Sequence, residues 1–260
     1  MTDSPLRIER DGAVAILTLD RPTSRNSLNR ELSLALGAAL RDVAGDPSVR
    51  AVVLTGAGDG FCSGADLKAG VTEIGAAPLD QRVDEFHAMI RGIVEAPQPF
   101  VAAVHGGAVG FGADLALACD LRILSTAGYL QEKFVKIGLM PDGGGTFWMP
   151  RLVGLGRAME YLMLGTRLDA PLALELGLAS RVVAPAELRE AALAVARELA
   201  SNAPLALTAI KRAVRASLDG GLDAALEREK QGQLRLLASE DLVEGVLAWS
   251  QRRPPTFHGR

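Results

Sequence analysis

Apolar and polar residues alternate near the start of the chain, first over Leu6–Arg10 and then over Val14–Leu19. A period of two is typical of β-strands, because successive side chains point to opposite faces of a sheet. The Asp11-Gly12 pair between the two runs favours a tight turn. This segment is therefore predicted to form an antiparallel hairpin.

After the hairpin, the spacing of apolar residues predicts a helix, then a strand, and then a second helix. Apolar residues recur at helical spacing from Leu28 to Val43, after Asn26-Ser27, which predicts a helix capped by that pair. A continuous apolar run at 51–55 predicts a buried strand, and Gly56–Gly60 predicts a turn directly after it. Helical spacing returns at about 81–94.

Strand, glycine turn and helix recur in the middle of the chain, and the remainder is mostly helical in pattern. Pro141–Thr146 opens that helical part, and its last segment is one long amphipathic stretch, Asp223–Gln251. The middle segments are a strand at Pro97–Val104, a glycine turn at Gly106–Gly112, a helix at Ala113–Ala118, and strands at Leu121–Leu124 and Tyr129–Phe134.

Composition narrows the class of protein. A chain of 260 residues with 48% hydrophobic content can bury one main α/β core. The net charge is only -3, so no basic field favours nucleic acid as a partner. No apolar run reaches the roughly 18 residues of a membrane helix.

The chain start lacks a secretory pattern and Cys62 and Cys119 lie in apolar surroundings, which predicts a cytoplasmic protein with reduced thiols. The three histidines have no metal-site spacing, so no metal is expected.

The two glycine turns place unpaired amide groups at helix N-termini, where partial positive charge collects. Together they could cradle an anion, or they could simply allow tight connections between strand and helix. A dinucleotide fold is disfavoured, since Gly110-Phe-Gly112 lacks the third glycine of G-x-G-x-x-G and Gly56-Ala-Gly58-Asp-Gly60 has the wrong spacing.

Four segments in this order resemble the crotonase family of enoyl-CoA hydratases and isomerases. The resemblance implies an α/β fold, a crotonase-like superhelix of repeated strand-strand-helix units over residues 1–195, and a helical oligomerisation region over 196–260. It also implies an acyl-CoA thioester as substrate, with coenzyme A as part of that substrate and no permanently bound cofactor, and a homotrimer or a dimer of trimers. The four segments are Arg21–Asn29, Val53–Leu67, Ala103–Asp120 and Gly138–Thr146.

The same resemblance implies how the thioester is held. Its carbonyl oxygen would accept hydrogen bonds from the backbone amides of Ala65 and Phe111, which stabilise the enolate that forms when the neighbouring carbon loses a proton. Arg25 is a candidate partner for a phosphate, although a solvated loop arginine is an equal alternative. The other residues expected to bind coenzyme A are Ser63, Ala65, Asp66 and Leu67, with Phe257 and Arg260 closing over the adenine from a neighbouring subunit.

Carboxylates decide which reaction is expected. Hydratases of this family use two glutamates, and the corresponding positions here carry Asp114 and Phe134. Glu132 would share a strand face with position 134 but lie about 6.6 Å away along the chain, so it fits that role poorly. Asp114 is either a second proton carrier or a cap on its helix. Phe134, Met140 and Trp148 are expected to line the acyl pocket.

Asp142 lies where the resemblance places the acid of enoyl-CoA isomerases and of ring-opening isomerases. One carboxylate there can take a proton from carbon 2 and return it to carbon 4, although Pro-Asp-Gly is also ordinary turn chemistry. The leading hypothesis is therefore an isomerase that shifts a double bond in an enoyl-CoA thioester, with Asp142 as the proton shuttle. The alternatives are a hydratase that relies on Asp114 and Asp142, and an acyl-CoA-binding relative without turnover.

Overall fold

An antiparallel hairpin opens the fold, as the alternating pattern predicts. The computed structural model describes residues 4–68 and 79–260. In it, β1 (Leu6–Asp11) pairs with β2 (Val14–Leu19), and Asp11 lies opposite Val14 at the turn. Gly12 has a φ of 56°, in the left-handed region that glycine adopts without strain.

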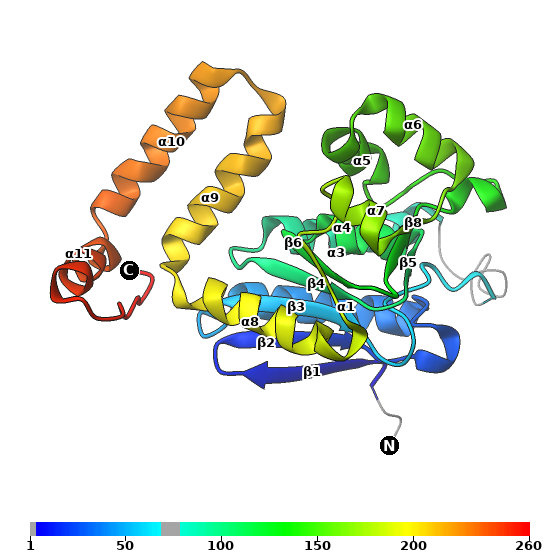
Figure 1. The fold of residues 1–260 in the computed structure, drawn as a ribbon, viewed down its shortest axis with the longest axis horizontal. Helices are drawn as coiled ribbons and strands as arrows, with labels where there is room; N and C mark the ends of the chain where they lie inside the picture. Colours follow the sequence, from blue (N-terminus) through cyan, green and yellow to red (C-terminus); the bar gives the residue numbers. More distant parts are fainter. Residues whose placement is uncertain (1–3, 69–78) are drawn as a thin grey trace.

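The strands of the described residues form two sheets (Figure 1). The larger has six strands in the order β1-β2-β3-β4-β6-β9, and each neighbouring pair from β2 onward is parallel. The smaller sheet has the order β5-β7-β8. The strands after the hairpin are β3 (Ala51–Gly56), β4 (Phe100–Val104), β5 (Gly107–Val109), β6 (Leu121–Ser125), β7 (Tyr129–Gln131), β8 (Leu168–Asp169) and β9 (Arg181–Val183).

Helices cover both faces of the larger sheet. Alternate residues of one strand enter two separate cores: Leu54 joins α1, α3 and α4 on one face, whereas Val53 joins α8 on the other. The helices are α1 (Arg30–Gly45), α3 (Leu79–Glu95), α4 (Phe111–Ala118), α5 (Gly145–Val153), α6 (Leu155–Leu164), α7 (Ala170–Glu175), α8 (Leu188–Ser201), α9 (Pro204–Ala216), α10 (Leu222–Leu237) and α11 (Glu240–Gln251). Short 3₁₀ turns lie at Pro22–Ser24, Phe134–Ile137, Pro185–Glu187 and Ser217–Asp219.

The first helix begins later than predicted. Asn29, not Asn26-Ser27, caps α1, since its Oδ1 accepts a hydrogen bond from the Leu32 amide at 3.0 Å. Asn26 is fully buried instead, and its Nδ2 donates to the carbonyls of Gly60 and Phe61 at 2.8 and 3.2 Å. Its side chain therefore holds the first glycine turn rather than the helix end.

Two other predictions from the pattern were wrong in part. The strand expected over Tyr129–Phe134 ends at Gln131, and Phe134 begins a 3₁₀ turn. The long amphipathic stretch after Asp223 is two helices, because Ser239 caps α11 by accepting a hydrogen bond from the Leu242 amide at 3.2 Å. The C-terminal half also contains the short strands β8 and β9.

The last three helices, α9 to α11, project away from the two sheets (Figure 1). They carry large apolar side chains on their surface, including Val214 at 61%, Leu222 at 73% and Trp249 at 83% exposure. A membrane-spanning helix is absent from the described part of the chain, since none is both long and apolar enough.

Candidate active site

The two glycine turns lie side by side. The Val109 amide donates to the Cys62 carbonyl at 2.9 Å, and the Cys62 amide donates to the Gly107 carbonyl at 3.0 Å. On the other side of the first turn, Leu28 and Ala65 form a β-bridge. The segment around Ala65 is thus fixed between the loop before α1 and the strand that leads into α4.

Both amides predicted to hold the thioester oxygen are available as donors. Among the hydrogen bonds of the described residues, none has the Ala65 or the Phe111 amide as its donor. Phe111 is the first residue of α4, where an amide has no partner within the helix. A Cβ added to Gly64 would lie 3.3 Å from the Phe111 amide nitrogen and 2.8 Å from the Val109 carbonyl oxygen. The two turns therefore approach each other closely at the predicted donors, and Gly64 is the residue that permits it.

Asp114 lies on the first turn of α4 and is completely buried. Its Oδ2 accepts a hydrogen bond from the Gly143 amide at 3.0 Å. This bond links α4 to the loop before α5, which carries Asp142. The side chain of Asp114 therefore does not cap α4, whose N-cap is Gly110 and has no side-chain cap.

Asp142 is half-buried and does not cap the helix that follows it. The N-cap of α5 is Gly144, which has no side-chain cap. One carboxylate oxygen of Asp142, Oδ1, is buried without a hydrogen-bond partner among the described residues. Turn chemistry alone therefore does not account for this carboxyl group.

The structure brings a third carboxyl group to the same place. Glu132 is 5% exposed, directly after β7, and both of its oxygens lack a hydrogen-bond partner within the described residues. A Cβ added to Gly145 would lie 2.9 Å from Glu132 Oε1 and 3.0 Å from Asp114 Oδ1, so the two carboxyl groups flank one point. Among the described residues, no three or more histidine, cysteine, aspartate or glutamate side chains are grouped so that they could hold a metal ion.

Burial raises the pKa values of all three acids, and the charge of a neighbouring acid adds to the rise for Asp114 and Glu132. Burial, followed by the charge of Asp142, raises the pKa of Asp114 to about 7, and the Gly143 amide acts in the opposite direction. The pKa of Glu132 rises well above its ordinary value, first through burial and then through the charge of Asp114. Burial raises the pKa of Asp142, while its own backbone amide and then the charge of His87 oppose that rise.

Sequence reasoning missed His87 and gave Glu132 a minor place. His87 lies on α3, and the spacing of apolar residues there predicts only that it occupies one position of a half-buried helix. The strand pattern of the sequence places Glu132 on the face of a strand, but that strand ends at Gln131, one residue earlier. No sequence signal marks that early end, because neither glycine nor proline lies between Gln131 and Phe134.

Phe134 forms an apolar wall beside the second glycine turn. It is 7% exposed, and its ring carbons lie 3.7 to 4.0 Å from the point that a Cβ on Gly110 would occupy. Gly110 immediately precedes Phe111, the predicted donor, whose ring packs against Phe86 of α3 with centroids 4.6 Å apart. The position where the resemblance places a hydratase glutamate is thus occupied by an aromatic ring.

The residues predicted to bind coenzyme A cluster at the first turn. The Ser63 amide donates to the Arg25 carbonyl at 3.0 Å, and Arg25 itself is exposed with a φ of 54°. Asp66 Oδ2 accepts hydrogen bonds from Ser27 Oγ and Arg21 Nη1, both at 3.1 Å. Leu67 is 51% exposed. Four of the predicted residues, Arg25, Ser63, Asp66 and Leu67, therefore lie at or beside the first glycine turn.

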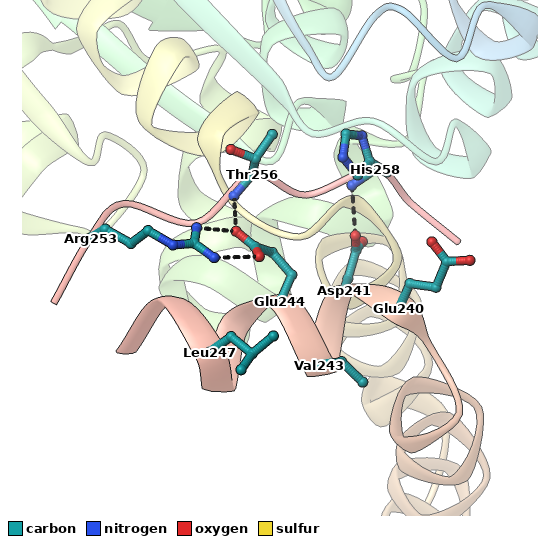
Figure 2. A pocket seen from close by; sticks show the side chains of 8 residues that line it. All are labelled: Glu240, Asp241, Val243, Glu244, Leu247, Arg253, Thr256 and His258. Atoms are coloured by element: carbon teal, nitrogen blue, oxygen red, sulfur yellow. Dashed lines mark hydrogen bonds and ion pairs between the residues drawn. The ribbon is translucent and has the colours of Figure 1, made fainter. Parts of the chain in front are cut away.

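Phe257 and Arg260 lie in the C-terminal tail, which folds back on α11. Glu244 accepts hydrogen bonds from Arg253 and from the Thr256 amide, and Asp241 accepts one from the His258 amide at 2.6 Å (Figure 2). Arg260 Nε donates to Glu240 at 2.8 Å, and the Phe257 ring lies beside Gly245. Both residues thus pack on α11 of their own chain, and a contact with a neighbouring subunit stays a prediction.

The predicted acyl-pocket residues do not share one environment. Met140 is 68% exposed, whereas Trp148 is half-buried and its Nε1 has no partner among the described residues. Trp148 lines a groove of about 930 Å³ between α3, α5 and α9. Phe134 is the one of the three for which a contact with the second glycine turn is described, at Gly110.

Comparison with known proteins defines the class. A solved structure of enoyl-CoA hydratase from Bacillus anthracis superposes with a TM-score of 0.92 at 33% identity, covering 98% of this chain and all of that one. The fold is therefore the crotonase fold. The family model for enoyl-CoA hydratase/isomerase matches residues 9–260. This chain belongs to the enoyl-CoA hydratase/isomerase family.

Two curated relatives carry different reaction names. The 1,2-epoxyphenylacetyl-CoA isomerase of Escherichia coli is 39% identical over 250 residues, or 95% of each chain. The carnitinyl-CoA dehydratase of Salmonella arizonae is 36% identical over 259 residues, or 98% of each chain. Similarity of this degree establishes that the chain is an enzyme of this family. Because the relatives differ in reaction, the specific reaction has to be inferred from the residues of the site.

Proposed function

We propose that this enzyme shifts the double bond of a 3-enoyl-CoA thioester to the 2-position. Asp142 takes a proton from carbon 2, and the electron pair moves onto the thioester oxygen to form an enolate. The amides of Ala65 and Phe111 donate hydrogen bonds to that oxygen. Asp142 then returns a proton to carbon 4 as the double bond re-forms between carbons 2 and 3.

The observation that carries this proposal is the aromatic ring of Phe134. A hydratase must hold a water molecule between two proton-transferring groups. Phe134 offers neither a proton nor a hydrogen bond, and its ring lies beside the turn that carries the Phe111 amide. An apolar wall suits a reaction that moves a proton within the substrate and adds nothing. The isomerase named among the relatives is consistent with this choice.

The test is product analysis with two substrates. The wild-type enzyme should convert 3-enoyl-CoA to 2-enoyl-CoA and add no water to 2-enoyl-CoA. Asp142→Asn should lower the rate of the shift by about 10²-fold or more, the usual loss when a general base is removed, while coenzyme A binding is retained. Asp42→Asn removes an exposed carboxylate of α1 and is the matched control. An unaltered shift in Asp142→Asn refutes the assignment.

Hydration of 2-enoyl-CoA is the second candidate, and one observation favours it. The amide of Gly143, the residue after Asp142, donates to Asp114 Oδ2 at 3.0 Å, and the charge of Asp142 raises the pKa of Asp114, so two acids lie near each other as a water-adding enzyme requires. In that case the product of 2-enoyl-CoA carries a hydroxyl group, and Asp114→Asn abolishes its formation.

We also propose a homotrimer or a dimer of trimers that forms through residues 196–260. The exposed apolar side chains of α9 to α11 support this proposal, because an apolar surface of this extent is usually covered by a partner. Light scattering on the purified protein distinguishes three, six or one copies. We further propose that the enzyme acts in the cytoplasm and without a permanently bound cofactor. Its two cysteines, Cys62 and Cys119, are buried and unpaired.

A further inference from the structure

Glu132 is a buried acid that the reaction proposed above does not use. It follows the end of β7, and the neighbouring Gln131 carbonyl accepts a hydrogen bond from the Gly110 amide at 2.8 Å. This bond ties the end of β7, which Glu132 follows, to the N-terminus of α4, the helix that carries Asp114. Both side chains meet at Gly145, where a Cβ would lie within 3.0 Å of one oxygen of each.

The charged groups that act on Glu132 would not stabilise its ionised form. The charged groups that act on it are Asp114 and Asp142, which are both acidic. His87 of α3 acts on Asp142. Lys133 and Lys136 follow in the chain, yet both are exposed, and neither forms an ion pair with Glu132 within the described residues. Two acids that share a buried site cannot both ionise easily, because each charge would lie near the other away from water.

We propose that Glu132 keeps its proton and donates it in a hydrogen bond to Asp114, which makes Glu132 a positioning residue for the loop that carries Asp142. The link runs through named contacts. Glu132 holds one oxygen of Asp114, and the other oxygen, Oδ2, accepts the Gly143 amide at 3.0 Å. Gly143 is the residue next to Asp142, so the orientation of Asp114 fixes where the proposed base stands.

This role explains two features at once. Both oxygens of Glu132 and Oδ1 of Asp114 have no other partner among the described residues, and a shared proton satisfies one oxygen of each. A neutral Glu132 also adds no further negative charge beside Asp142. Glu132 thus supplies the third carboxyl group of the site in its acid form, from a position two residues before Phe134.

Infrared difference spectra between ordinary water and deuterium oxide test directly whether Glu132 keeps its proton. The test does not depend on which reaction the enzyme catalyses. At pH 8 ordinary carboxyl groups are ionised, so a carboxylic-acid C=O band that shifts in deuterium oxide marks a retained proton. We expect this band in the wild-type protein and in Asp142→Asn, and its loss in Glu132→Gln. The exposed Glu198→Gln is the matched control and should leave the band unchanged. A wild-type spectrum without the band overturns the proposal, even if the enzyme proves to be an isomerase.

Kinetics test the positioning role, which rests on the proposed function. Glutamine at 132 still donates a hydrogen bond to Asp114, whereas methionine has a similar size and no donor. We expect Glu132→Gln to retain the double-bond shift and Glu132→Met to lower kcat by about ten-fold or more with little change in KM, because a charged acceptor loses its donor. Equal kcat values in the two variants overturn the role of the hydrogen bond. If neither 3-enoyl-CoA nor 2-enoyl-CoA reacts, the proposed function fails, and the infrared band still decides the protonation of Glu132.

Discussion

The buried carboxyl group of Asp114 predicts a specific dependence of stability on pH. Its pKa is about 7 in the folded protein, against an ordinary value of 3.8. A raised pKa means that the folded state holds the proton more tightly than the unfolded state. The stabilisation from this group is therefore complete below pH 3.8 and is lost as the pH rises through 7. Asp114→Asn removes this dependence, since an amide has no charge to bury.

The size of the effect follows from the two pKa values. At pH 5 the folded protein still holds the proton, two pH units below the folded pKa, and this is worth roughly 3 kcal/mol of unfolding free energy. At pH 8 the contribution has vanished. The stability of Asp114→Asn relative to the wild type should thus rise by roughly 3 kcal/mol between pH 5 and pH 8. For a chain of this length the change corresponds to roughly 5–10 °C in Tm.

The assay is thermal unfolding of both proteins at equal concentration across pH 5 to 8. Asp42→Asn loses an exposed charge in α1 and provides the comparison for a simple change of net charge. We expect the Tm of Asp114→Asn minus that of the wild type to rise with pH, and the corresponding difference for Asp42→Asn to stay constant. A constant gap for Asp114→Asn refutes the reasoning, because it means that Asp114 ionises like a solvated aspartate.

Three further perturbations have defined outcomes. The rate of the double-bond shift should fall as the pH drops through a pKa above the ordinary aspartate value, since burial raises that of Asp142 and only its ionised form accepts a proton; a rate that holds to pH 4 contradicts this. Gly64→Ala places a Cβ 2.8 Å from the Val109 carbonyl oxygen and should lower kcat by about 10²-fold through displacement of the Ala65 amide, whereas an unchanged kcat speaks against the donor pair. Asn26→Ala removes the Nδ2 donor from the carbonyls of Ala57, Gly60 and Phe61 and should destabilise the fold by about 2–4 kcal/mol in urea unfolding; a loss under about 0.5 kcal/mol shows that these carbonyls find other partners.

Local turn chemistry made much of the fold predictable. The Asp11-Gly12 pair specifies the hairpin, and the glycines after β3 and β4 mark where the chain leaves the sheet. The division of α10 from α11 was also present in the sequence, as Ser239 followed by Glu240 and Asp241, a typical helix start. The amphipathic pattern continues across the break, so periodicity alone predicts one helix there.

The arrangement of the acids could not be read from the sequence. Glu132 meets Asp114 only because β7 ends at Gln131 and a 3₁₀ turn begins at Phe134. A strand pattern continues through this segment, so periodicity places Glu132 at the wrong point. The shared burial of three carboxyl groups depends on contacts between β7, α4 and the loop before α5, which are distant in sequence. Such tertiary contacts carry no local signal.

The central claim is that one carboxylate, Asp142, both removes and returns the migrating proton. Its most direct test uses 3-enoyl-CoA with deuterium at carbon 2, incubated with the enzyme in ordinary water, and reads the position of deuterium in the product by nuclear magnetic resonance. Transfer by a single group predicts 2-enoyl-CoA with part of the deuterium at carbon 4. A product with no deuterium at carbon 4, or one that carries a hydroxyl group at carbon 3, contradicts the account.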